Sequence, residues 1–257
     1  NKDNPKKYFD LREDIAQSIS SEIKRNTFPQ QAKVNLDGNK DEYSIEYTFN
    51  PKLQKQAQNL LKQYKPDYGA IFMIDAETGK VLAMASQQKS NPHGDNLNLR
   101  ATFPAASVFK VVTATAAVDY ANVEPSHKIA FNGANYTLHK RNVLSDKVNR
   151  WTRYITLKDA FARSINTAFG RLTLESLNPA VLTEYAEKFQ FNTDLKTDFN
   201  VEASQAYIPN EAGFELTQVA AGYNRKNTLS PVHGAMIAAS IVNNGKITDY
   251  LFLSSGS

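Results

Sequence analysis

The sequence contains no cysteine, and its histidines are few and scattered, at His93, His127, His139 and His233. Without cysteine the chain has no disulfide framework, no thiol nucleophile and no cysteine-ligated zinc site. The histidines do not show the close spacing at which two side chains of one element share a metal ion, so we expect no metal. Nothing in the sequence calls for a cofactor, and any catalysis has to come from oxygen and nitrogen side chains.

Long apolar runs and a strong charge imbalance are also lacking. No stretch approaches the roughly 20 apolar residues that a membrane-spanning helix needs. The 30 basic and 26 acidic residues give a formal charge of +4, which is too small to indicate a nucleic-acid partner. Because the chain starts at Asn1 rather than methionine, we expect an upstream leader or membrane anchor that this sequence does not include.

What is present is an ordinary globular composition, with 257 residues that are 41% hydrophobic. That is enough for one large domain, with or without a smaller one. Residues 1–42 differ from the rest, because an amphipathic helical pattern over residues 8–25 is followed by a polar, turn-rich stretch. We expect them to be an N-terminal appendage or linker, and residues 43–257 to form the main domain.

The main domain shows strand patterns followed by a helical block, which indicates an α+β or α/β fold. Alternation predicts a strand over residues 43–49, and residues 69–86 predict two apolar strands joined by a tight turn. Asn50-Pro51 and Asn178-Pro179 each supply a cap and a first-position proline for a helix. Further helical patterns cover residues 108–121, 156–176, 178–189 and 229–244.

The stretch FPAASVFKVV, residues 103–112, places Ser107 and Lys110 one helical turn apart, so that their side chains share a face. The following run is apolar almost all round, and Lys110 is its only charge before Asp119. A buried amine is pushed toward its neutral form, and a neutral amine beside a hydroxyl can act as its base. The pair is therefore a candidate nucleophile and base.

Ser-x-x-Lys is a common pattern, and the two further copies, Ser21/Lys24 and Ser86/Lys89, are most simply solvated surface. For Ser107 the alternative to catalysis is a plain helix N-cap, and the pattern alone does not separate the two. A serine at a helix start does gain unpaired backbone N–H groups, which can stabilise an oxyanion formed by its own attack.

A second candidate pair is Ser164 and Asn166, two residues apart in the apolar segment ARSINTAF. Ser176 and Asn178 have the same spacing, but at a helix boundary where Asn178 is expected to be a cap. Taken alone, Ser164 is best explained as a packed or back-bonded helical serine. Beside a Ser/Lys pair, however, a second hydroxyl could relay protons and an amide could hold the substrate.

Together these segments resemble the transpeptidase domain of penicillin-binding proteins, the D,D-transpeptidases that crosslink peptidoglycan. GAIFMIDAETGKVLAMAS resembles the opening hairpin of that family, and LRATFPAASVFK its nucleophile segment. ITLKDAFARSINTAFG resembles its second motif, and LSPVHGAMIAASIVNNGK its late helix. The blocks occur in family order between residues 43 and 250, and no glycosyltransferase-like domain accompanies them, which favours a class B-like or free-standing transpeptidase.

The resemblance implies an α+β fold with an antiparallel sheet and a helical domain. It implies that Ser107 attacks a terminal D-Ala-D-Ala to form an acyl-enzyme, with Lys110 as its base. Ser164 would relay a proton to the leaving amine, Asn166 would bind the substrate amide, and the Ser107 N–H would be half of the oxyanion hole. An amine from a second stem peptide would resolve the ester, and β-lactams would acylate Ser107 as substrate mimics.

The resemblance also implies a setting for the protein. We expect a periplasmic or otherwise extracytoplasmic location, with anchoring to the cytoplasmic membrane by a segment outside this sequence. Peptidoglycan stem peptides and β-lactams are the expected ligands, with other cell-wall synthesis proteins as candidate partners and no cofactor.

The third motif of the family, Lys-Ser/Thr-Gly on a strand, is not found. Residues 196–198 are KTD, and residues 255–256 are SG without the lysine. We expect the sequence to stop before the last strands and helix of the family, and such a chain to be a poor enzyme. Ala106 stands where the family usually has Gly, and Val111 where class A members often have Pro.

Other interpretations stay open on sequence alone. A D,D-carboxypeptidase differs only in using water as the acceptor. A β-lactamase needs a deacylating base, and Glu175 lies in a helical pattern that matches the family's loop poorly. A non-catalytic β-lactam sensor or scaffold is supported only by the missing third motif. The basic patch made by residues 139–141 (HKR) and 150–153 (RWTR), with one aromatic, is expected to be a solvated loop, with contact to anionic wall polymer or lipid headgroups as the alternative.

Overall fold

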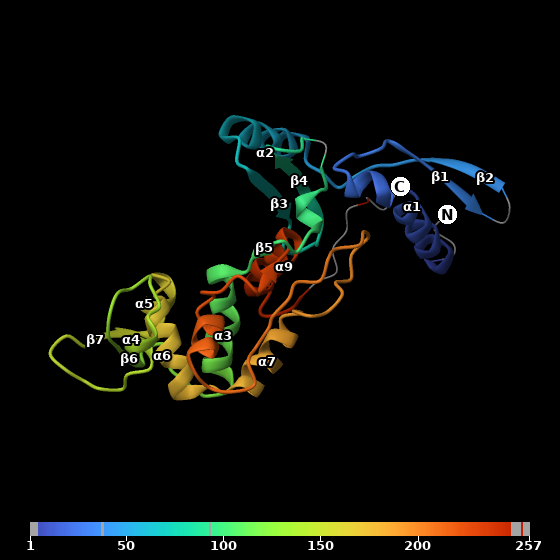
Figure 1. Ribbon diagram of the computed structural model, residues 1–257. Helices are drawn as coiled ribbons and strands as arrows, with labels where there is room; N and C mark the ends of the chain where they lie inside the picture. Colours follow the sequence, from blue (N-terminus) through green and yellow to red (C-terminus); the bar gives the residue numbers. More distant parts are fainter. Residues whose placement is uncertain (1–4, 37–38, 93, 248–252, 254–257) are drawn as a thin grey trace. The chain divides into compact units, whose positions relative to one another are not determined.

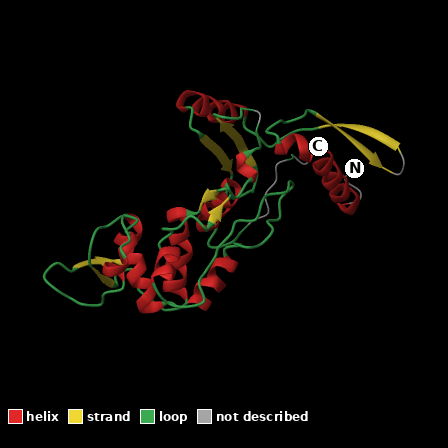
Figure 2. Cartoon of the chain, viewed as in Figure 1, coloured by secondary structure: helices red, strands yellow, loops and turns green. Residues whose placement is uncertain are grey.

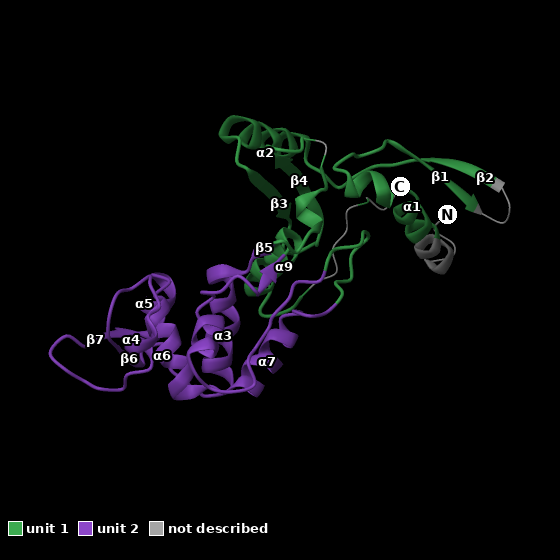
Figure 3. Cartoon of the chain, viewed as in Figure 1, with its two compact units in different colours: residues 1–102, 194–202, 230–257 green, residues 103–193, 203–229 purple. Residues whose placement is uncertain are grey.

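The computed structural model describes residues 5–36, 39–92, 94–247 and 253, and Figure 1 labels its elements. The chain divides into two compact units (Figure 3). Unit 1 consists of residues 1–102, 194–202 and 230–257, and unit 2 of residues 103–193 and 203–229. No helix in the described part of the chain is both long and apolar enough to cross a bilayer.

Unit 1 opens with helix α1 (Pro5–Lys24), followed by an antiparallel hairpin of β1 (Gln31–Leu36) and β2 (Asn39–Ser44). The predicted amphipathic helix is confirmed. The turn-rich expectation for the next stretch is wrong, because QAKVNL alternates and buries Ala32 and Val34 on one face. The domain boundary at residue 43 stays a prediction.

The strand predicted over residues 43–49 is wrong, because β2 ends at Ser44 and only Tyr47 makes an isolated bridge, to Leu253. From residue 50 on, the elements of unit 1 follow the predicted pattern. Asn50 caps α2 (Pro51–Tyr64), since its Oδ1 accepts hydrogen bonds from the backbone N–H groups of residues 52 and 53. β3 (Tyr68–Ile74) and β4 (Val81–Gln88) form the predicted antiparallel hairpin. Helix α2 packs on this hairpin (Figure 1). The contact is apolar, and most of its buried side chains are small: Ala57, Leu61, Ala83 and Ala85.

Unit 1 is completed by a 3-10 turn, η1 (Leu97–Leu99), and by α9 (Pro231–Val242), whose cap Ser230 accepts a hydrogen bond from the backbone of His233. One apolar cluster joins these elements to α1 and the hairpin. Its buried members include Ile19, Ile23, Val81, Met84, Leu99, Phe199, Val232 and Met236. The segment 194–202 therefore belongs to the core that α1 covers.

Unit 2 is mainly helical (Figure 2). It begins with β5 (Phe103–Pro104), which pairs with β8 (Thr228–Leu229), then η2 (Ala106–Val108) and the buried helix α3 (Phe109–Asp119). The remaining elements are β6 (Lys128–Phe131), α4 (Lys140–Val143), β7 (Arg153–Thr156), α5 (Leu157–Ala162), α6 (Asn166–Ser176), α7 (Pro179–Lys188) and α8 (Phe214–Ala220). Strands β6 and β7 pair antiparallel.

The helices α3, α6 and α8 pack against one another and surround the centre of unit 2. The predicted helix over residues 156–176 is instead two helices, because Ser164 adopts a left-handed φ of +54° and interrupts it. Asn178 caps α7 as expected, accepting from the backbone of Val181 at 3.0 Å. Helix α8 was not predicted, because seven residues are too few to show a helical period.

A nearly buried ion pair ties α1 to the segment 194–202. Arg12 binds Asp198 through two nitrogens, with Nε to Oδ1 at 2.9 Å and an Nη to Oδ2 at 2.7 Å. The two side chains are only 11% and 10% exposed. Arg12 also donates to the carbonyl of Leu253 at 3.0 Å. Bidentate pairs of this kind are strong, and each charge depends on the other for its solvation.

We expect Arg12→Met to lower the free energy of unfolding by about 3 kcal/mol, because it leaves the Asp198 carboxylate buried without its partner. Adding Asp198→Asn should cost less than the sum of the single changes, as a urea double-mutant cycle can measure. Lys89→Met is the control, because its pair with Asp67 is 69% and 80% exposed and should be worth under about 1 kcal/mol. A loss at Arg12 as small as that at Lys89 would contradict this account.

Candidate active site

The four side chains singled out by the sequence meet at the start of α3, within unit 2. The Lys110 Nζ lies 3.0 Å from the Ser107 Oγ and 2.6 Å from the Asn166 Oδ1. The Ser164 hydroxyl donates to the Ser107 Oγ at 2.9 Å. All four predicted site residues are therefore in one hydrogen-bonded group, although 56 residues separate Lys110 from Asn166.

Ser107 lies in the turn η2, immediately before the first residue of α3. Its hydroxyl is not a helix cap: the cap positions are Ala105 for η2 and Val108 for α3, and neither makes a side-chain cap bond. Instead the hydroxyl is exposed and bonded to Lys110 and Ser164. The N-cap interpretation of Ser107 is thus wrong, and the one-turn spacing does bring the hydroxyl and the amine together.

The backbone conformation of the turn η2, called the nucleophile turn below because it carries the candidate nucleophile Ser107, depends on a glycine in another segment. Ala106 has a φ of +45°, in the left-handed region, and Gly222 has a φ of +64°. A Cβ on Gly222 would lie 1.8 Å from the carbonyl oxygen of Ala106 and 3.1 Å from the backbone nitrogen of Ser107. Only glycine lets the chain after α8 approach the turn this closely.

Ser164 owes its position to the break between α5 and α6. Its N–H donates to the carbonyl of Phe161 at 3.0 Å, and its φ of +54° turns the chain before α6 begins. A left-handed residue that is not glycine costs roughly 1–2 kcal/mol, and such strain is concentrated at functional sites. The explanation of Ser164 as a packed or back-bonded helical serine is wrong.

Lys110 is almost completely buried, with 1% of its surface exposed. Its Nζ lies 5.7 Å from the centroid of the Phe169 ring and 2.6 Å from the carbonyl oxygen of Ala221. No carboxylate forms an ion pair with it among the described residues. Burial therefore dominates and lowers the pKa of Lys110 to about 8.

The three neighbours of the Lys110 Nζ differ in what they can do. The Asn166 Oδ1 and the Ala221 carbonyl oxygen only accept hydrogen bonds, whereas the Ser107 hydroxyl can donate as well as accept. A neutral amine has two N–H groups and one lone pair. When its N–H groups bond to the two obligate acceptors, the lone pair is directed at the Ser107 hydroxyl proton.

Asn166 is itself held by the loop before α4. Its Nδ2 donates to the carbonyl of Tyr136 at 2.7 Å, and its backbone N–H donates to the carbonyl of Asn135 at 2.9 Å. These carbonyls and that of Ala221 were missed from the sequence, because a backbone oxygen carries no side-chain signal. Gly222 in AAGYN was the one readable clue to the close approach there.

The backbone N–H of Ser107 is a free donor beside the hydroxyl, since within the described ranges it bonds to no carbonyl. The segments considered for a third motif lie elsewhere or are not described. Residues 196–198 are in unit 1, where Asp198 binds Arg12, and residues 255–256 lie outside the described residues. The Ser107 N–H is therefore a candidate donor for an oxyanion.

The remaining polar side chains singled out by the sequence either form an ion pair or are exposed to solvent. Glu175, the candidate base of the β-lactamase alternative, lies on α6 and pairs with Arg171 at 2.8 Å. The basic patch of residues 139–141 and 150–153 is largely exposed, as expected, and the Arg150 guanidinium lies 4.7 Å from the centroid of the Trp151 ring. No group of three or more potential metal ligands occurs in the part of the chain that the structure describes.

The chain is similar to known cell-wall enzymes. It is 27% identical over 237 residues to the peptidoglycan D,D-transpeptidase PbpA of Mycobacterium tuberculosis, covering 79% of this chain and 46% of that protein. It is 21% identical over 231 residues to the stage V sporulation protein D of Bacillus subtilis, covering 82% and 35%. The chain thus spans about half or less of the length of these relatives.

Solved structures of penicillin-binding protein A from M. tuberculosis share the fold. The ceftriaxone acyl-enzyme complex matches with a TM-score of 0.64 at 24% identity, covering 81% of this chain and 53% of that one. The penicillin G acyl-enzyme complex matches with a TM-score of 0.65 at 24% identity, covering 81% and 54%. The predicted α+β fold of the penicillin-binding proteins is confirmed.

The family model described as the penicillin binding protein transpeptidase domain matches residues 69–256, which is most of the chain. This range contains both the Ser107/Lys110 pair and the Ser164/Asn166 pair. The chain belongs to the penicillin-binding protein transpeptidase family.

Proposed function

We propose that the chain carries the acylating site of a serine-type D,D-transpeptidase, which crosslinks peptidoglycan through an acyl-enzyme formed on D-Ala-D-Ala stem peptides. The observation that carries the proposal is the contact of 3.0 Å between the Ser107 Oγ and the Nζ of Lys110, which is buried and forms no ion pair among the described residues. A serine needs a base to be a nucleophile, and a desolvated lysine supplies one without a histidine.

In the proposed acylation step, the neutral Lys110 amine takes the proton of the Ser107 hydroxyl. The Ser107 Oγ forms a bond to the carbonyl carbon of the penultimate D-alanine, and the carbonyl oxygen becomes an oxyanion. The Ser107 N–H stabilises that oxyanion, as unpaired amides at a helix start can do. Before the transfer, the two acceptors on Lys110 keep its lone pair directed at the hydroxyl; after it, they hold two of the three N–H groups of the ammonium.

Collapse of the tetrahedral intermediate breaks the bond to the terminal D-alanine, whose nitrogen has to gain a proton. Ser164 is the proposed donor, because its hydroxyl lies 2.9 Å from the Ser107 Oγ. It would give its own proton to the leaving nitrogen and take a proton in turn from the Lys110 ammonium, whose N–H is on the same Ser107 oxygen. In the second half of the reaction, the amine of another stem peptide attacks the ester. The same side chains then transfer protons in the opposite direction: the attacking amine loses a proton, and the Ser107 oxygen regains one as it leaves.

The alternative enzymes, a D,D-carboxypeptidase and a β-lactamase, would form the same kind of acyl-enzyme. They differ from a transpeptidase in the molecule that accepts the acyl group, which is water. A D,D-carboxypeptidase would use water in the second half, and nothing in the geometry of the site favours it. A β-lactamase would need a free deacylating base, and Glu175 is occupied by Arg171. The PbpA relative is named for peptidoglycan transpeptidation, which supports the transpeptidase and an extracytoplasmic place of action. β-Lactams follow as inhibitors, as in the acyl-enzyme complexes of the M. tuberculosis protein.

We expect penicillin G to add one covalent adduct to the protein, located on Ser107 by peptide mapping after intact mass spectrometry. Lys110→Ala should slow its formation by roughly 10²–10⁴-fold, the usual contribution of a general base. Lys188→Ala, which removes an exposed lysine of the same unit, should leave the rate unchanged. An adduct on another residue, or a wild-type rate in Lys110→Ala, would refute the proposal.

The acylation rate should rise with pH through about 8, the pKa to which burial lowers Lys110. Below that value the amine is protonated and has no lone pair, so the rate should fall about tenfold per pH unit; above it the rate should level off. Stopped-flow acylation with a chromogenic β-lactam between pH 6 and 10 measures this profile. A flat profile over that range would count against Lys110 as the base.

Asn166→Asp is the matched variant for this profile, because it puts a carboxylate of the same shape 2.6 Å from the Lys110 Nζ. A neighbouring negative charge stabilises the ammonium, so the midpoint should move to higher pH. Asn166→Ala removes the acceptor without adding charge and should not move the midpoint upward. Identical midpoints in the aspartate variant and the wild type would contradict the role given to this contact.

Gly222→Ala should reduce acylation at least about 100-fold, because the new Cβ would lie 1.8 Å from the Ala106 carbonyl oxygen and displace the nucleophile turn. Gly213→Ala is the control, since its Cβ meets nothing within 4 Å. Circular dichroism would check that both variants fold, and rates of penicillin G acylation would compare them. Equal rates in the two variants would show that the close approach at Gly222 is not needed.

A further inference from the structure

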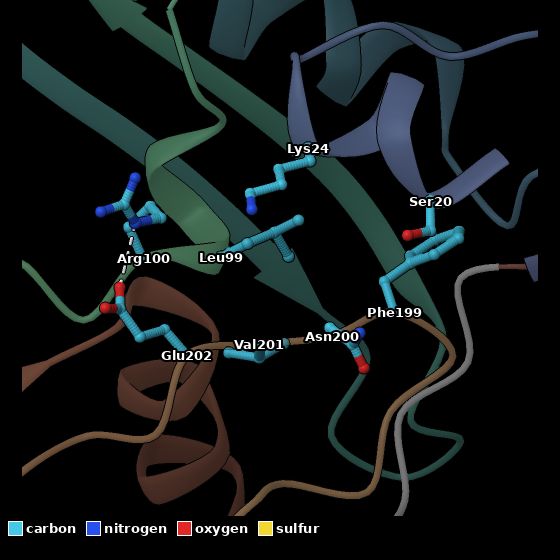
Figure 4. A pocket seen from close by; sticks show the side chains of 8 residues that line it. All are labelled: Ser20, Lys24, Leu99, Arg100, Phe199, Asn200, Val201 and Glu202. Carbon is cyan, nitrogen blue, oxygen red and sulfur yellow. Dashed lines mark hydrogen bonds and ion pairs between the residues drawn. The ribbon is translucent and has the colours of Figure 1, made fainter. Parts of the chain in front are cut away.

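Unit 1 contains a cavity that the proposed reaction does not use. It has a volume of about 440 Å³ and lies between α1, the end of η1 and residues 199–202 (Figure 4). Its apolar lining consists of the buried side chains of Leu99, Phe199 and Val201. The size falls in the range of about 300–1,000 Å³ that is usual for ligand sites, and an apolar surface with a few polar groups is their usual lining.

The polar groups of the cavity are available to a ligand. Lys24 extends across it, and the Ser20 hydroxyl and the Asn200 amide also line it (Figure 4). Within the described residues, the Lys24 ammonium forms no ion pair and the side chains of Ser20 and Asn200 form no hydrogen bond. Lys24 and Asn200 are exposed and Ser20 is half-buried, so these groups can exchange bound water for the polar atoms of a ligand.

The opposite wall is held rigidly. Arg100 donates through Nε to the Glu202 Oε2 at 3.0 Å and also pairs with Asp95. The same Glu202 oxygen accepts from the backbone of Ala101 at 2.9 Å, and the Glu202 N–H donates to the Leu99 carbonyl at 2.8 Å. Of the three charged side chains that line the cavity, Arg100 and Glu202 pair with each other and Lys24 does not form an ion pair within the described residues, so Lys24 is the group that can meet a single negative group of a ligand.

The cavity continues as a groove along α1. An adjoining hollow of about 370 Å³ shares Ser20, Phe199 and Asn200 with it and extends to Gln17 and Glu13. Positions 13, 17, 20 and 24 recur every three or four residues and therefore line one face of the helix. From Glu13 to Lys24 the helix rises about 16 Å, which is the length of about five residues of extended chain.

The two ends of this groove carry opposite unpaired charges. Among the described residues the Glu13 carboxylate, like the Lys24 ammonium, forms no ion pair. Between them lie the side chains of Gln17, Ser20 and Asn200, which can both donate and accept hydrogen bonds. They can therefore bind the N–H and carbonyl groups of a peptide backbone. A phosphate dianion fits less well, because the carboxylates of Glu202 and Asp198 also line the hollows.

We propose that this groove binds a short extended peptide of about four or five residues, with its C-terminal carboxylate at Lys24 and an amine at Glu13. All its lining residues belong to unit 1, whereas Ser107 belongs to unit 2. It recognises free peptide ends, and the apolar lining takes a small aliphatic side chain.

The test uses isothermal titration calorimetry on the Ser107→Ala variant, which removes the nucleophile and any turnover. The probe is the pentapeptide Lys-Ala-Ala-Ala-Ala with a free carboxylate, compared with its C-terminal amide. The free acid should bind at least tenfold more tightly than the amide. Adding Lys24→Ala should remove that preference, because it takes away the charge that meets the carboxylate.

Arg25→Ala is the matched control, since it removes an exposed positive charge from the next position on the chain without lining either hollow. Arg25→Ala should change the affinity for the free acid by less than about twofold, which is well below the expected tenfold preference for the acid over the amide. Both lost charges are exposed, so both variants should melt like their parent. Equal affinities for acid and amide, equal losses in the Lys24 and Arg25 variants, or no binding of the free acid would each overturn the proposal.

Discussion

The burial of one amine governs the geometry of the candidate active site. Lys110 is 1% exposed and keeps its place through three hydrogen bonds, to Ser107, Asn166 and the Ala221 carbonyl. Those partners come from η2, from α6 and from the residue after α8, so the packing of α3 against α6 and α8 is what assembles the site. Burial also lowers the pKa of the amine, and the same packing therefore sets both geometry and reactivity.

Backbone strain surrounds this amine. Ala106 and Ser164 both have left-handed φ values, +45° and +54°, although neither is glycine. Each conformation costs roughly 1–2 kcal/mol that the core of unit 2 has to offset. Gly222 meets the same demand without a Cβ and lets its segment lie against the nucleophile turn. Stability is given up where the serine hydroxyls have to converge, which is typical of reactive sites.

Much of the fold and of the site could be predicted from the sequence, because the signals were local. Proline after asparagine marked α2 and α7, and an apolar run interrupted by one lysine marked α3. The misses were not local. The break at Ser164 comes from one left-handed residue that is not glycine, and the backbone carbonyls that accept from Lys110 and Asn166 lie on segments distant in sequence. The β1–β2 hairpin was overlooked because its short alternation stands among turn-forming residues.

The most direct test of the account is the pKa of Lys110 itself, measured by NMR titration of the side-chain ¹³Cε signal in protein labelled at lysine. Comparison with the Lys110→Arg variant would assign the signal. We predict a midpoint at about 8, well below the ordinary value of 10.5, with burial as the cause. A midpoint near 10.5 would mean that the amine is charged at neutral pH, and the role of Lys110 as the base would be contradicted.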